Sequence, residues 1–259
     1  MAKLFIGKSK SPTSWQNVSK WYNKTVDKNG SYFHQHVIIP GVLKLLNLNS
    51  KSSLLDLACG QGVLERKISP GIYYQGLDAA FDLIKFAQKN KISNTHHFQV
   101  ADITKPFPIS KFDFTLATII LALQNIEDPD KLITLINKHL IKSGKLIIVI
   151  NHPCFRIPKN SSWGIDTKNK IQYRRLDRYL SSLKIAIDIH PGLKQGSPQT
   201  PTYHYSLSYF SQILSDSGFV IEKIEEWVSD KKSVGPSANM ENIARSEFPL
   251  FLTIVACKI

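Results

Sequence analysis

Acidic residues near the ends of successive apolar segments most constrain the fold of this chain. The segment 53–57 reads as a short apolar strand that contains Asp56 and runs into the turn Gly60-Gln61-Gly62. Asp78 and Asp102 follow the next two apolar segments. In an open parallel sheet the carboxyl ends of the strands meet at one edge, where ligands bind. We therefore predict three carboxylates along one sheet edge, beside a turn whose glycines let a ligand approach the backbone.

The remaining pattern predicts a mostly parallel sheet with helices on both faces. The segment 145–150 is apolar on both sides, which is typical of a central strand covered by helices. Asp128-Pro129 is typical of a helix start and Ser143-Gly144 of a helix end. No helical pattern separates the last two strands, so we expect them to pair antiparallel. The predicted strands are 53–57, 73–77, 97–100, 112–119, 145–150, 219–227 and 248–257, and the predicted helices are 11–27, 35–47, 63–68, 81–88, 128–143, 175–183 and 207–217.

These elements indicate one α/β domain of 259 residues, which is long enough to bury a substantial core. We divide it into an N-terminal helical cap (1–49), a ligand-binding core (50–150), an insertion after the fifth strand (151–205) and the last part of the sheet (206–259). The insertion is rich in Pro, His, Tyr and Arg and shows little periodicity. It is expected to cover the sheet edge as a lid.

Composition limits the classes of function. The net charge of +13 would attract nucleic acid or acidic ligands, although the excess of Lys over Arg also fits a coding bias spread over the surface. No apolar run is long enough to predict a membrane span, and the N-terminal apolar stretch is too short for a signal peptide. Cys59, Cys154 and Cys257 lie far apart, which predicts a reduced, cytoplasmic chain without a metal site.

The glycine turn does not match the dinucleotide fingerprint. That fingerprint requires a third glycine three residues after the second, where this chain has Glu65. Asp56 would also repel a pyrophosphate. A Gly-x-Gly turn that follows one acidic strand end and precedes two more favours a ligand with an adenosine and a positive charge, such as S-adenosylmethionine.

Residues 50–150 resemble the class I S-adenosylmethionine-dependent methyltransferases. The stretch Asp56–Gly62 is similar to their first motif, Asp78 to the ribose-binding carboxylate, Ala101-Asp102-Ile103 to the adenine-pocket motif, and Phe112-Asp113-Phe114 to the start of the fourth-strand motif. The resemblance implies their Rossmann-like fold: a seven-stranded, mostly parallel sheet with an antiparallel seventh strand, helices on both faces and, here, an insertion after strand five. It also implies S-adenosyl-L-methionine as the cofactor.

The likeness extends to a bacterial group of stand-alone methyltransferases whose substrates are unassigned. It is carried by the segments 15–22, 32–34, 151–158, 173–175, 203–204 and 225–227. In many relatives an N-terminal tyrosine closes over the methionine end of the cofactor, and Tyr22 matches it. Tyr22 is followed by Asn23, where those relatives often have Asp.

The chemistry of this cofactor assigns a task to each carboxylate. Asp78 suits the ribose hydroxyls, Asp102 the adenine amino group and Asp56 the ammonium. The complete predicted cofactor set is Tyr22, Asp56, Ala58, Cys59, Gly60, Gly62, Asp78, Ala79, Asp102, Ile103 and Thr118.

Candidates for the acceptor site follow strand five. His152 is a candidate general base, with a histidine held by neighbouring backbone as the alternative. Arg156, Arg174 and Arg175 are candidates for binding an anionic acceptor, and Tyr173 and His204 for lining its pocket, whereas ion-paired or packing roles are the alternatives. Cys154 is a candidate nucleophile of the kind used on cytosine in RNA, but a buried structural cysteine is the default.

Three functions are consistent with the sequence. The leading hypothesis is transfer of a methyl group to an oxygen or nitrogen of a small molecule. The positive charge motivates a second, methylation of RNA, and the third is a non-catalytic cofactor-binding protein. The segment Ala117–Leu121 lacks the Asn- or Asp-Pro-Pro pattern of methyltransferases that act on exocyclic base amines, which argues against that target. The acceptor and the oligomeric state stay open.

Overall fold

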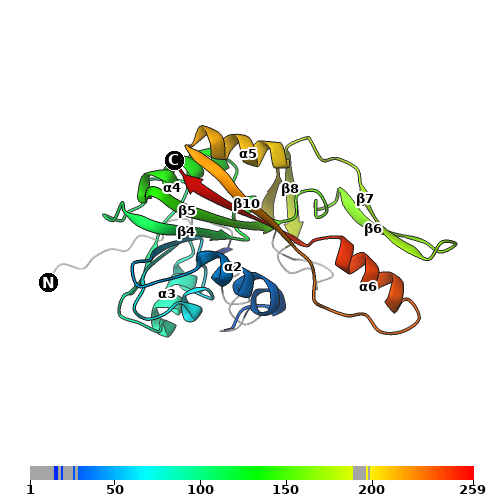
Figure 1. The fold of residues 1–259 in the computed structure, drawn as a ribbon, viewed down its shortest axis with the longest axis horizontal. Helices are drawn as coiled ribbons and strands as arrows, with labels where there is room; N and C mark the ends of the chain where they lie inside the picture. The colour runs from blue at the N-terminus through cyan, green and yellow to red at the C-terminus, as the bar shows by residue number, and fades with distance from the viewer. Residues whose placement is uncertain (1–14, 17–18, 20–25, 27–28, 189–196, 198) are drawn as a thin grey trace.

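The computed structural model describes residues 15, 16, 19, 26, 29–188, 197 and 199–259 (Figure 1). A seven-stranded sheet forms the centre, and its order is β10-β11-β5-β4-β1-β2-β3. Strand β11 pairs antiparallel with both β5 and β10, and the other pairs are parallel, so the predicted fold class is confirmed. The strands of this sheet are β1 (Ser53–Leu57), β2 (Tyr73–Asp78), β3 (His96–Val100), β4 (Phe114–Ile120), β5 (Leu140–Asn151), β10 (Phe219–Trp227) and β11 (Phe251–Lys258).

Helices cover both faces of the sheet. A π-helical turn, η2 (His34–Ile38), leads into α2 (Ile39–Leu46), which lies with α3 (Phe81–Asn90) on one face. The helices α4 (Pro129–His139) and α5 (Leu207–Asp216) lie on the other face (Figure 1). No helix in the described part of the chain is long and apolar enough to cross a membrane.

Strand β5 shows why the central strands are apolar on both sides. Its successive side chains point to opposite faces. Ile148 belongs to the apolar cluster that includes residues of α4 and α5, whereas Ile147 and Val149 belong to the cluster that includes residues of α2 and α3. All three side chains are fully buried, and each contributes roughly 1.5–3 kcal/mol relative to exposure.

One predicted helix does not form as an α-helix, and the predicted end of another was wrong. The segment after the glycine turn forms turns and a 3-10 helix, η3 (Glu65–Lys67), instead of an α-helix over 63–68. Helix α4 ends at His139 and not at Ser143. The amine of Lys258 in β11 donates to the carbonyls of Asn137 and Leu140, and so satisfies the end of this helix from a distant part of the chain.

The insertion also differs from the prediction. It contains two hairpins, β6 (Ser161–Asp166) with β7 (Ile171–Leu176) and β8 (Leu183–Asp188) with β9 (Gln199–His204), and no helix over 175–183. The first hairpin extends away from the sheet beside α6 (Ala238–Glu247) (Figure 1). Helix α6 was missed between β10 and β11 because Ala244 is its one buried residue, so its sequence carries no apolar stripe.

Candidate functional site

The turn after β1 is built from residues with left-handed backbone. The φ angles are 52° at Ala58, 56° at Gly60 and 80° at Gly62. Glycine adopts this conformation without steric cost, whereas Ala58 is strained there. The N–H of Cys59 donates to the carbonyl of Leu77 in β2, which holds the turn against the neighbouring strand. The turn therefore presents its backbone at the carboxyl edge of the sheet.

Asp78 connects the end of β2 to this turn. One of its carboxylate oxygens accepts a hydrogen bond from the N–H of Gly60 at 2.9 Å, and the other accepts from the N–H of Ala80 at 2.8 Å. Burial raises the pKa of this carboxyl, while the two N–H groups oppose the shift. Each oxygen keeps capacity for a further hydrogen bond. The arrangement suits two adjacent hydroxyl donors, such as those of a ribose. The adjoining predicted residue, Ala79, is partly exposed.

Asp56 is held from two neighbouring strands. Its carboxylate accepts hydrogen bonds from the hydroxyl of Tyr74 in β2 at 2.6 Å and of Thr118 in β4 at 2.8 Å. Burial raises its pKa to about 6, although the two hydroxyls lower it in part. Thr118 is fully buried and acts by holding Asp56, and it does not line the pocket. Sequence reasoning missed Tyr74 because an apolar strand predicts a packing role for a tyrosine.

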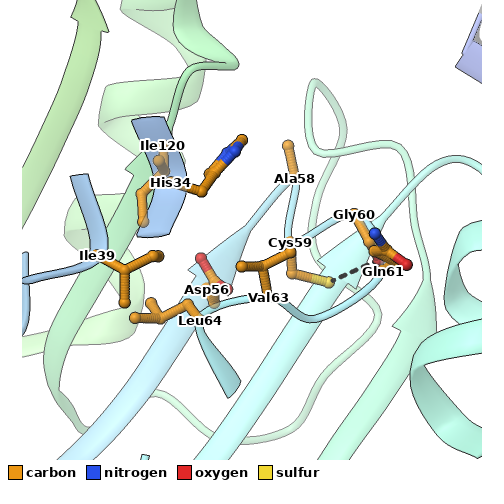
Figure 2. A pocket seen from close by; sticks show the side chains of 10 residues that line it. All are labelled: His34, Ile39, Asp56, Ala58, Cys59, Gly60, Gln61, Val63, Leu64 and Ile120. Carbon is orange, nitrogen blue, oxygen red and sulfur yellow. Dashed lines mark hydrogen bonds between the residues drawn. The ribbon is translucent and has the colours of Figure 1, made fainter. Parts of the chain in front are cut away.

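A pocket opens between the glycine turn and η2 (Figure 2). Asp56 and the turn residues form its polar side, and side chains from η2, α2 and the end of β4 stand opposite. This combination of a carboxylate, exposed backbone and aliphatic walls fits the cationic, partly aliphatic methionine end of S-adenosylmethionine. The pocket is lined by His34, Ile39, Asp56, Ala58, Cys59, Gly60, Gln61, Val63, Leu64 and Ile120.

The predicted adenine-pocket residues lie after β3. Asp102 accepts hydrogen bonds from the N–H and the hydroxyl of Thr104 at 3.0 and 2.6 Å. Partial burial raises the pKa of this carboxyl, but the Thr104 bonds and Lys105 outweigh that effect, so the pKa is lowered. Ile103 is buried in the apolar cluster with Phe107. Since β1, β2 and β3 are neighbours, the three acids lie at successive strand ends. Tyr22 falls outside the described residues.

The structure does not support His152 as a general base. Its ring is 1% exposed, and both nitrogens are engaged: Nε2 lies 2.6 Å from a carboxylate oxygen of Glu226, and Nδ1 accepts the N–H of Cys154 at 3.1 Å. An Nδ1 that accepts is unprotonated, so Nε2 carries the proton and donates to Glu226. Burial lowers the pKa of His152, although Glu226 opposes this. The histidine thus joins β5 to β10 and leaves no nitrogen for an acceptor.

The predicted substrate residues separate into two places. Arg156 and His204 line a second hollow beside the end of β5. Arg174 lies in β7, where it donates to the carbonyl of Phe155 and the hydroxyl of Ser161. Tyr173, also in β7, packs over Gly164 of the paired strand.

Cys154 is not suited to nucleophilic attack. Burial raises its pKa, which keeps the group as a thiol, whereas a nucleophilic cysteine needs a lowered pKa.

The strand order, the antiparallel last strand and the glycine turn next to Asp78 define the class I methyltransferase fold. Residues 55–148 match the family described as a methyltransferase domain. Over 70 residues the chain is 36% identical to an uncharacterised methyltransferase from Schizosaccharomyces pombe. This match covers 27% of the chain and spans only about a quarter of that relative, 26% of its length.

Two solved structures share the fold over most of the chain. One is an S-adenosylmethionine-dependent methyltransferase from Mesorhizobium loti, with a TM-score of 0.65, 23% identity, and coverage of 84% of this chain and 96% of that one. The other, from Listeria monocytogenes, has a TM-score of 0.65, 22% identity, and coverage of 85% and 99%. These two structures show that the chain has the fold of S-adenosylmethionine-dependent methyltransferases, and the domain match covers residues 55–148 within that fold.

Proposed function

We propose that this chain binds S-adenosylmethionine at the glycine turn and transfers its methyl group to an oxygen or nitrogen of a small molecule. The observation that carries the proposal is the double hydrogen bond of Asp78 to Gly60 and Ala80, which fixes a carboxylate next to exposed backbone at the sheet edge. When bound, S-adenosylmethionine supplies an electrophilic methyl group on a sulfonium. Transfer is an in-line displacement, so alignment and exclusion of water supply most of the acceleration.

Residues of the pocket and of the neighbouring strand ends divide these tasks. Asp78 binds the ribose hydroxyls, and Asp56 favours the ammonium of the methionine end. Asp102 follows β3, where its carboxylate accepts from the adenine amino group. Ile39 and Ile120 form apolar walls that exclude water from the positive charge. With both nitrogens of His152 engaged, we propose that proton removal from the acceptor does not depend on it.

Calorimetry with S-adenosylmethionine and S-adenosylhomocysteine tests the binding step. We expect both to bind at one site per chain, and absence of binding would refute the proposal. Transfer of a radiolabelled methyl group into fractionated cell extract then tests catalysis. Label in the metabolite fraction supports a small-molecule acceptor, whereas binding without transfer to any fraction supports a non-catalytic protein.

The net charge of +13 favours RNA as a second candidate acceptor. Phosphate contacts release counterions, so RNA affinity would fall steeply with salt. Filter binding of total cellular RNA over a salt series, together with label in the RNA fraction, would support this candidate. RNA binding without transfer of label to RNA would show only attraction of RNA to the positively charged surface.

Cofactor affinity is expected to depend on pH through Asp56. Its pKa of about 6 means that the carboxylate loses its charge as the pH falls through this value. The affinity for S-adenosylhomocysteine should therefore drop roughly tenfold between neutral pH and about pH 5, and level off above neutrality. Calorimetry across this range measures the effect.

Asp56 affects the free energy of unfolding in the opposite direction from its effect on cofactor affinity. Because the folded pKa lies above the unfolded value, Asp56 contributes stability at low pH that is lost as the pH rises through about 6.

Asp56→Asn should abolish the pH dependence of cofactor affinity in this range. A dependence that persists in this variant would assign it to another group.

A further inference from the structure

A second hollow lies at the carboxyl end of β5. It is enclosed by the residues after β5, the segment after β4, strand β9 and helix α5. Its walls are largely apolar or aromatic, with Ile150, Tyr203 and Phe210 among them, and Asn151, Arg156 and His204 contribute polar groups. The proposed cofactor pocket does not account for this hollow, because the two share no lining residue.

Arg156 is the charged side chain of this hollow, and no described acidic residue forms an ion pair with it. One guanidinium nitrogen donates to the side-chain oxygen of Asn151 at 2.9 Å, and the guanidinium carbon lies 5.6 Å from the centre of the Phe251 ring. Burial lowers the pKa of Arg156, and the like charge of Arg174 lowers it further. Charges that are removed from water are normally paired. Within the described part of the chain, the site therefore has a cation without a counter-charge.

Two other polar side chains of the hollow, His204 and Tyr205, are already used within the protein, whereas Gln124 keeps an uncharged side-chain oxygen without a hydrogen-bond partner in the described structure. Nε2 of His204 donates to the carbonyl of Tyr179 at 2.6 Å, and burial lowers the pKa of this histidine, which favours its neutral form. The hydroxyl of Tyr205 donates to the carbonyl of Glu127. Arg156 is consequently the group in the lining with charge to offer to a ligand.

The position of the hollow suits a methyl acceptor. Ile120, which lines the cofactor pocket, is the register partner of Val149 in β5. The next two residues of β5, Ile150 and Asn151, line the second hollow. Both cavities thus lie at the same sheet edge over neighbouring strands.

We propose that this hollow is the acceptor site and that the acceptor carries an oxyanion, a carboxylate or a phosphate, on an apolar body. The guanidinium of Arg156 binds the oxyanion in two-point geometry, and the aromatic walls hold the body. The assignment of the ligand as a methyl acceptor rests on the proposed function, but binding of the oxyanion does not require the cofactor.

Ligand-observed NMR titration of the cofactor-free chain tests this inference. The probes are phenylacetate, phenyl phosphate and the uncharged phenylacetamide. We expect at least one of the two anions to bind in the millimolar range typical of fragments and roughly tenfold or more tighter than the amide. Comparison of the two anions identifies which oxyanion the site prefers.

Substitutions at Arg156 test whether this side chain causes the preference for anionic probes. Arg156→Met keeps the length and apolar stem of the side chain and should abolish the preference for the anions, while Arg156→Lys keeps the charge and should retain part of it. Arg175→Met is the matched control, because Arg175 is exposed and pairs with Asp177 outside the hollow. It should bind the probes as the unmodified chain does. If Arg156→Met does not fold, as judged by thermal melting, the Lys variant carries the test through a several-fold loss of anion affinity.

Three results would overturn the inference: equal affinity for the anions and the amide, no detectable binding of either anion, or an anion preference that survives the changes at Arg156. Affinity for S-adenosylhomocysteine is measured on the same samples and should stay within about twofold in all variants. If the unmodified chain binds the anions but not the cofactor, the proposed function alone is refuted. If it binds the cofactor but shows no preference for the anions, this inference alone is refuted.

Discussion

Asp78→Ala is expected to weaken S-adenosylhomocysteine binding roughly a hundredfold. Two hydroxyl donors that lose a charged acceptor each forfeit about 1.5–3 kcal/mol, and part of this is recovered from water. The change also leaves the N–H groups of Gly60 and Ala80 without their acceptor. We therefore expect the free energy of unfolding to fall by about 1–3 kcal/mol in addition.

Calorimetry measures the affinity and urea unfolding measures the stability. Asp78→Asn separates the two effects, because the amide oxygen accepts one N–H but the charge is gone; it should restore part of the stability and little of the affinity. Asp113→Ala is the control, since this carboxylate is exposed and pairs with Lys111 near the opposite end of β4. Cofactor affinity in Asp78→Ala within threefold of the unmodified chain would contradict the assigned role.

Glu65→Ala is expected to have the largest effect on stability. Glu65 and His96 are both fully buried, and the carboxylate lies 2.6 Å from Nδ1 of the imidazole. The same oxygen accepts the N–H of Ile92 at 2.9 Å. Removing one partner of such a pair leaves the other without compensation, which costs about 3–5 kcal/mol. Urea unfolding should show this loss as a shift of the midpoint.

A double variant tests whether the pair itself is responsible. In Glu65→Leu combined with His96→Leu, neither polar partner is stranded, so the double variant should be more stable than Glu65→Ala. Ser93→Ala in the neighbouring exposed turn serves as a mild control, because its hydroxyl bonds are at the surface. A loss below about 1 kcal/mol in Glu65→Ala would show that the pair contributes little.

Local patterns were sufficient for the strands that build the site. The apolar runs ending near Asp56, Asp78 and Asp102 predicted three strand ends at one edge, and the structure places them on adjacent strands. Strand periodicity and the demand for glycine at left-handed positions act over a few residues, so a single sequence reveals them. The same reasoning predicted α5 and β10 nearly to the residue.

Elements whose stability comes from distant contacts were not predictable in this way. The end of α4 depends on Lys258, more than a hundred positions along the chain, and the polar helix α6 has little apolar pattern of its own. In the insertion, two hairpins replace the expected helix over 175–183 because strand pairing between separate segments outweighs local propensity.

For the side chains of the site, the sequence predicted their positions, whereas the tertiary structure decides their ionisation. Residue type and spacing showed where carboxylates would gather, because the strand ends of a parallel sheet share one edge. The ionisation of those groups depends on tertiary contacts. The carboxylate of Asp56 accepts hydrogen bonds from hydroxyls 18 and 62 positions away, and the imidazole of His152 is hydrogen-bonded to Glu226, 74 positions away. Burial and hydrogen-bond partners decide which group is charged and which nitrogen is engaged, and chain folding alone brings those partners together.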